Sequence, residues 1–99
     1  MDKVYLKVFK SKNCTLIAAC DEELIGKTFK EGKLQIQVKR DFYGENPTSI
    51  DKALDMINGA DIANLVGKTV IKAAIDKGYV SKDAVIYIAG IPHVQVVKI

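Results

Sequence analysis

The sequence is poor in residues that mark several large classes of protein. Its 99 residues include no tryptophan, two prolines, two cysteines and one histidine. No stretch approaches the roughly 18 uninterrupted apolar residues that a membrane span needs. Lysines stand in the N-terminal segment MDKVYLKVFK, where a signal peptide would carry its apolar centre. The sequence therefore predicts a cytoplasmic protein that has no membrane partner.

The two cysteines, Cys14 and Cys20, bound the run CTLIAAC, which reads as one extended strand. At roughly 3.3 Å per residue, their Cα atoms would lie about 20 Å apart, too far for a disulfide or a shared metal ion. The single histidine is His93. We therefore expect reduced thiols, no metal site and no cofactor.

The positive charge is small and unevenly placed. The net charge is +3, and 14 of the 15 basic residues are lysine, the other being Arg40. Residues 1–40 hold nine basic against five acidic side chains, whereas residues 41–99 hold six against seven. The basic excess belongs to the N-terminal part, so this part of the surface bears on the choice of partner. A lysine-rich, arginine-poor surface suits solubility more than planar bidentate recognition of phosphate or guanine.

Three segments in the first forty residues predict strands. Residues 3–10 and 33–40 alternate apolar and polar side chains, the second most strongly. Residues 14–20 are more apolar and follow a short polar turn, which predicts an antiparallel hairpin with the first strand. Asp21 is placed to cap a one-turn helix over residues 22–25.

Helical spacing dominates the middle of the chain. It predicts a helix over residues 50–57, capped by Thr48 or Ser49, that ends at Gly59, after a loop over residues 41–47. The same spacing continues from Asp61 to Gly78, although residues 61–67 can form either a helix or a strand. Gly67 interrupts this stretch, so either the backbone packs closely there or the helix begins only near Asn64.

The last segments, residues 84–90 and 91–99, predict two strands around a turn at residues 90–92, either as a closing hairpin or as strands in different sheet positions. The order of elements is strand, strand, strand, helix, helix, strand, strand. We therefore expect one α+β domain over residues 1–99, with a mainly antiparallel sheet of about five strands and two main helices packed against it.

The run of Gly67, Lys68 and Thr69 looks like the end of a phosphate-binding loop. Such a loop needs another glycine five positions before Gly67, and that position is Ile62. Without this glycine the backbone cannot form the amide nest that holds phosphate. We therefore expect no nucleotide loop here.

Four short strings mark a family resemblance: CDEELIGKTF from residue 20, FYGE from residue 42, IANLVG from residue 62 and IPHVQVV from residue 91. In this order and spacing they resemble an archaeal family of unknown function, domain-of-unknown-function family four hundred and twenty-four. The resemblance spans nearly the whole chain and implies a free-standing archaeal cytoplasmic protein, with no established activity. The positions that match the family's motifs are Cys20, Asp21, Gly26, Tyr43, Asn64, Gly67, Pro92 and His93.

The polar faces of the two alternating strands combine lysines with aromatic rings. If these strands are neighbours in one sheet, lysines can neutralise RNA phosphates while the rings stack on bases. The alternative is a solvated sheet face whose lysines guard an edge against unwanted pairing. Our leading hypothesis is a non-enzymatic RNA-binding or ribonucleoprotein accessory module. Its site comprises Lys3, Tyr5, Lys7, Lys33, Gln35 and Lys39, accompanied by Phe9 and Gln37.

A second hypothesis is a small enzyme or small-ligand site. Cys20 precedes a short helix, which favours a thiolate, but the carboxylates of residues 21–23 oppose it and favour a buried structural cysteine. His93 also reads as structural, with one backbone partner. The site requires that four polar side chains converge in one pocket: Cys20, Asp21, Asn64 and His93. A third reading, a protein adaptor, requires an exposed apolar patch around Phe42 and Tyr43.

Overall fold

The computed structural model of the chain describes residues 3–44 and 46–98. The strands in it are β1 (Lys3–Lys10), β2 (Thr15–Asp21), β3 (Thr28–Glu31), β4 (Leu34–Gln37), β5 (Asn46–Ser49), β6 (Ile62–Val66), β7 (Ile86–Ile88) and β8 (Ile91–Val97). The α-helices are α1 (Arg40–Tyr43), α2 (Ile50–Asn58) and α3 (Lys68–Asp76), and short 3₁₀ turns lie at Glu22–Leu24 and Lys82–Ala84.

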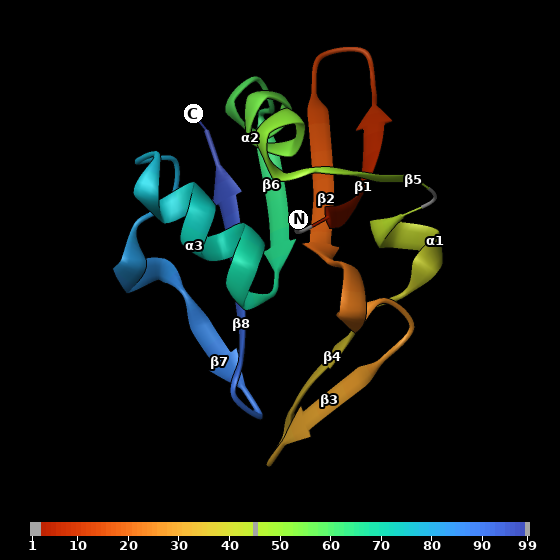
Figure 1. The fold of residues 1–99 in the computed structure, drawn as a ribbon, viewed down its shortest axis with the longest axis vertical. Coiled ribbons are helices and arrows are strands. Elements are labelled where there is room, and N and C mark those ends of the chain that lie inside the picture. The colour runs from red at the N-terminus through yellow and green to blue at the C-terminus, as the bar shows by residue number, and fades with distance from the viewer. Residues whose placement is uncertain (1–2, 45, 99) are drawn as a thin grey trace.

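The described residues form a six-stranded sheet in the order β5-β1-β2-β6-β8-β7, together with a separate β3–β4 hairpin. The β2–β6 pair is parallel, and the other pairs in the sheet are antiparallel. In Figure 1, α2 and α3 lie over the strands on the near side, α1 lies beside β1, and the hairpin extends below the sheet. The protein is thus an α+β domain with a mixed sheet.

The larger core lies between the sheet and the two longer helices. Alternate residues of the central strands, among them Ile17, Leu65 and Val94, point to this side and are almost fully buried. They meet the apolar stripes of α2 and α3, which include Leu54 and Val70. We call this side of the sheet the helix-covered face, and its hydrophobic burial is the main stabilising term of the fold.

The other side of the sheet carries a second core that is richer in aromatic side chains. The remaining alternate residues point there, and we call this side the aromatic face, defined by Tyr5, Phe9, Ala18, Cys20, Asn64, Val66 and His93. Shorter elements cover it: Leu24 comes from the first 3₁₀ turn, Ile36 from the β3–β4 hairpin and Tyr43 from α1.

Residues 61–67, which the sequence leaves open between helix and strand, contain a strand. Ile62–Val66 form β6, and the helix begins only at Lys68. Because β6 is a central strand packed on both faces, its apolar side chains do not alternate with polar ones, and a short apolar run fits either period. The sheet of the described residues has six strands and one parallel pair, where a mainly antiparallel sheet of about five strands is predicted.

Three further boundaries differ from the prediction. The strand predicted over residues 33–40 is limited to Leu34–Gln37, and the preceding residues Thr28–Glu31 form its unpredicted hairpin partner. The segment predicted as loop contains α1 and the edge strand Asn46–Ser49. These elements are only four residues long and largely exposed, so they leave little periodic signal.

Two further predictions are confirmed, the first hairpin and the start of the first long helix. β1 and β2 form the expected antiparallel hairpin. Of the two arrangements left open for the last two strands, β7 and β8 form the closing hairpin. Helix α2 begins after Ser49, whose hydroxyl accepts a hydrogen bond from the Lys52 N–H at 3.2 Å. Within residues 3–44 and 46–98, the structure contains no helix that is both long and apolar enough to cross a membrane.

Candidate functional site

Most of the motif residues gather where β2 and β6 end side by side. Because these two strands are parallel, their carboxyl ends lie side by side at the same end of the sheet, next to the start of α3. Asp21 is 4% exposed, and its carboxylate accepts hydrogen bonds from the N–H groups of Thr69 (2.8 Å) and Val70 (2.9 Å). Asp21 therefore satisfies free N–H groups of the first turn of α3 and favours its dipole.

Gly67 allows this close contact between Asp21 and α3. Its φ is +118°, and a Cβ at this position would overlap the Asp21 carboxylate. The Gly67 N–H donates to the carbonyl of Pro92 at 3.0 Å, which ties the same point to β8. Of the two explanations for this glycine, close backbone packing is correct. The predicted cap is wrong, because the Asp21 side chain makes no cap hydrogen bond to the described turn Glu22–Leu24.

Polar contacts join α1 to the sheet: Lys7 Nζ of β1 donates to the Asp41 carbonyl at 2.8 Å, and Tyr43 bonds to Asn64. The Tyr43 hydroxyl donates to Asn64 Oδ1 at 2.5 Å, and the Tyr43 side chain is 3% exposed. Burial raises the pKa of Tyr43 above its usual range, and the nearby Cys20 adds to the effect. Phe42 is half-buried, so an exposed apolar patch around Phe42 and Tyr43, as the adaptor hypothesis requires, is absent from the described surface.

Cys20 and His93 lie in one row across the aromatic face, with Val66 between them. Two strand spacings separate their backbones by about 10 Å. Burial, Asp21 and Glu23 raise the pKa of Cys20 to about 12, so this fully buried thiol stays protonated at neutral pH. A protonated thiol is a poor nucleophile, and the geometry gives Cys20 a packing role.

His93 is half-buried at the rim of this row. Its Nδ1 lies 3.1 Å from the carbonyl oxygen of Leu65, and because a carbonyl only accepts, Nδ1 carries the proton. Burial lowers the pKa of His93. Cys20, Asn64 and His93 thus share the aromatic face, whereas Asp21, which pairs with Val4, points to the other side.

No group of three or more metal-ligating side chains that could hold an ion occurs in the described parts of the chain. Both cysteines are free. Gly26, another motif position, donates its N–H to the carbonyl of Val38 at 2.7 Å and has a φ of +84°. This glycine joins the end of the first 3₁₀ turn to the chain that leads into α1.

The residues predicted to bind RNA fall into two groups. Lys3, Tyr5 and Lys7 lie on β1 and point to the aromatic face, and Lys39 precedes α1, which packs against β1. Lys33 and Gln35 belong to the β3–β4 hairpin. The two alternating strands are therefore in different sheets, and the condition that they be neighbours is not met.

A cluster of cations and aromatic rings lies between β1 and α1. The rings of Phe9 and Phe42 stack with centroids 5.3 Å apart, and Lys7 Nζ lies 5.3 Å from the Phe9 centroid. Arg40 lies 5.8 Å from the centroid of Tyr5. Sequence reasoning did not include Phe42 and Arg40 in this site, because it placed Phe42 in a loop and ended a strand at Arg40.

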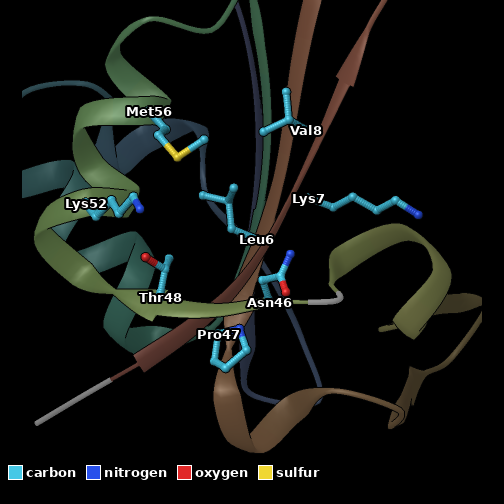
Figure 2. Close-up of a pocket in the computed structure, with 8 residues that line it drawn as sticks. All are labelled: Leu6, Lys7, Val8, Asn46, Pro47, Thr48, Lys52 and Met56. Atoms are coloured by element: carbon cyan, nitrogen blue, oxygen red, sulfur yellow. The ribbon is translucent and has the colours of Figure 1, made fainter.

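A groove of about 510 Å³ lies at the edge of the sheet, next to α2 (Figure 2). Its lining residues come from β1, β5 and α2: Leu6, Lys7, Val8, Asn46, Pro47, Thr48, Lys52 and Met56. In Figure 2, Leu6, Val8 and Met56 point toward one another, whereas Lys7 extends away. The groove contains none of the family motif positions.

The fold and these contacts define a small α+β protein whose mixed sheet carries two helices on one face and short elements on the other. The chain belongs to the family described as protein of unknown function (DUF424), which it matches over residues 9–99. This confirms the resemblance seen in the sequence.

A crystal structure of an uncharacterized conserved protein from Methanopyrus kandleri has the same fold. Its TM-score is 0.79 at 22% identity, and the match covers 95% of this chain and 90% of that chain. The likeness is one of fold. No functionally curated protein matches the sequence.

Proposed function

We propose that this protein is a non-enzymatic module that binds single-stranded RNA on the aromatic face, between β1 and α1. The observation that carries the proposal is the cluster of cations and aromatic rings formed by Lys7, Phe9, Arg40 and Phe42 with Tyr5. Proteins that bind single strands combine positive charges along the backbone path with aromatic rings that accept stacked bases.

Charge and exposure around the cluster support this proposal. Lys3, Lys39 and Arg40 are exposed. Phe9 and Phe42 stack on each other and are each half-buried, so only part of each ring can meet a base beside these cations. Helices α2 and α3 lie on the opposite face and leave this side of β1 uncovered by long elements. The proposed site keeps Lys3, Tyr5, Lys7 and Lys39 from the sequence prediction, without Lys33 and Gln35.

The test measures the affinity for a single-stranded RNA oligomer across a salt series. A variant with Lys3, Lys7, Lys39 and Arg40 changed to glutamine should bind more weakly. For this variant, the slope of log affinity against log salt concentration should be shallower by roughly 0.7 for each phosphate that it no longer neutralises. Phe42→Leu should weaken binding at all salt concentrations, because one stacked base contributes about 1–3 kcal/mol.

The matched control changes four lysines on the helical side to glutamine: Lys52, Lys72, Lys77 and Lys82. It removes the same amount of charge from α2, α3 and the second 3₁₀ turn. It should retain most of the affinity. Equal losses in both variants would mean nonspecific attraction by net charge, and absence of binding at low salt would refute the proposal.

A further inference from the structure

The edge strand β5 is shorter than β1. It pairs with Lys3–Leu6 of β1, so among the described residues no strand pairs with Val8 or Lys10 on the outer side. The groove of Figure 2 opens at this point, between the end of β5 and helix α2. The second half of β1 is therefore an open sheet edge beside a groove.

The direction of the backbone groups follows from the β1–β2 hairpin. The Ser11 N–H donates to the Cys14 carbonyl at 2.9 Å, and hydrogen-bonded pairs alternate along an antiparallel ladder. The backbone N–H and C=O groups of Phe9 therefore face β2, and the backbone groups of Val8 and Lys10 face outward, away from β2. The position of Pro47 agrees with this alternation. It pairs with Tyr5, whose backbone groups also face β2, so no backbone N–H is needed at Pro47 for the pairing with β1.

The groove offers a place for side chains of an added strand. Val8, Leu6 and Met56 give it an apolar floor, and Lys52 of α2 points into it (Figure 2). Val8 and Lys10 are two residues apart on β1, so both side chains lie on the helix-covered face. A strand paired with this edge would place an apolar side chain opposite Val8 and its next same-face neighbour opposite Lys10.

We propose that the outer edge of β1 binds an extended acidic peptide by strand addition. The peptide pairs with the outward N–H and C=O groups of Val8 and Lys10, buries one aliphatic side chain against Met56, and places one carboxylate opposite Lys10. Because β5 occupies the edge from Leu6 onward, the rest of the peptide leaves the edge there and brings its second carboxylate toward Lys52 of α2. Strand addition of this kind takes its affinity from main-chain hydrogen bonds and its specificity from alternate side chains.

Charge selects this occupant over a second copy of the chain. A second β1 edge has the sequence KVYLKVFK and offers no carboxylate to Lys10, whereas an acidic peptide does. Among the described residues that line the groove, Lys52 points into it and none carries a carboxylate. The surface lies at the sheet edge on the side of α2, away from the aromatic face, so the two proposals stand or fall separately.

The experiment titrates the ¹⁵N-labelled full chain with a blocked peptide, Thr-Glu-Thr-Val-Thr-Glu-Thr, and with its counterpart in which lysines replace the glutamates. The glutamate peptide should shift the amide signals of the groove residues and slow hydrogen exchange at Val8 and Lys10. It should bind roughly tenfold more tightly than the lysine peptide, as expected for two exposed ion pairs against two repulsions.

A charge swap sharpens the test. The double variant Lys10→Glu with Lys52→Glu should prefer the lysine peptide, whereas the control Lys77→Glu with Lys82→Glu should keep the preference for glutamate. The inference is overturned by absence of shifts at the groove, by unchanged exchange at Val8 and Lys10, or by a preference that the swap leaves unaltered. Concentration-dependent shifts without peptide would assign the edge to a second copy and also overturn it.

Discussion

Helices α3 and α1 lie on opposite faces of the same sheet, and each is held to it by polar contacts. The nine-residue α3 is held by the Asp21 carboxylate, which accepts hydrogen bonds from two backbone N–H groups in a space that only Gly67 allows. The four-residue α1 is held by the hydrogen bond from the Tyr43 hydroxyl to Asn64, which is part-buried, and by an exposed one from Lys7 Nζ to the Asp41 carbonyl at 2.8 Å.

The difference shows how the two faces divide structure and accessibility. Helix α3 also buries Val70, Ile71 and Ala74, so its polar contact lies within a continuous core. The buried residue of α1 is Tyr43, and its neighbour Phe42 remains half-buried. We expect the helix-covered face to determine stability and the aromatic face to open locally at lower cost.

The largest effect should come from Gly67→Ala. The added Cβ must displace the Asp21 carboxylate from α3, and alanine is strained at a φ of +118°. The backbone strain and the loss of the hydrogen bonds to the buried Asp21 carboxylate should together lower the free energy of unfolding by about 4 kcal/mol or more. Urea unfolding measures this decrease.

Gly78→Ala is the matched control. Its φ is +79°, and nothing lies within 4 Å of the added Cβ, so only the backbone strain is introduced. This control should lose about 1–2 kcal/mol. Equal losses in the two variants would mean that the contact with Asp21 does not hold α3.

Sequence reasoning succeeded where a local pattern determines the element. The alternation of β1 and the Ser49-capped stripe of α2 are examples, since each buries one side and exposes the other. It left Ile62–Val66 open between helix and strand, because contacts on both faces of this strand remove the alternation. It also gave Asp21 to the nearest turn, although its partners Thr69 and Val70 lie 48 and 49 residues away.

A smaller effect should follow from Tyr43→Phe. This change removes the hydroxyl and leaves the part-buried Asn64 oxygen without this donor, which should cost about 1–2 kcal/mol. Native-state hydrogen exchange should become faster at the amides of Phe42 and Tyr43, which donate hydrogen bonds to the Lys39 carbonyl.

Tyr87→Phe is the control. Tyr87 is 59% exposed, and the expected change in the free energy of unfolding is within about 0.5 kcal/mol. A neutral Tyr43→Phe variant would contradict our account of α1.

The candidate site shows the same limit of sequence reasoning. The residues Lys3, Tyr5 and Lys7 could be placed on one face of a strand by their alternation alone. Nothing local indicates that α1 folds back onto this strand and brings Arg40 over Tyr5 and Phe42 against Phe9. The pairing of distant segments depends on the whole core, so the cluster could be found only in three dimensions.

The smallest effect should be a pH dependence from His93 at the rim of the aromatic face. Burial lowers its pKa below the value of 6.5 expected for the unfolded chain, and the hydrogen bond to Leu65 offsets part of this shift. As the pH falls through 6.5, the unfolded chain binds a proton before the folded protein does, so the free energy of unfolding decreases. His93→Gln removes this step, and because the chain has one histidine, the difference between wild type and variant from pH 7.5 to 5.5 isolates it. Parallel pH profiles of wild type and variant would mean that water reaches the His93 ring as freely in the folded protein as in the unfolded chain. The rim of the aromatic face would then be as open as the free edge of the sheet.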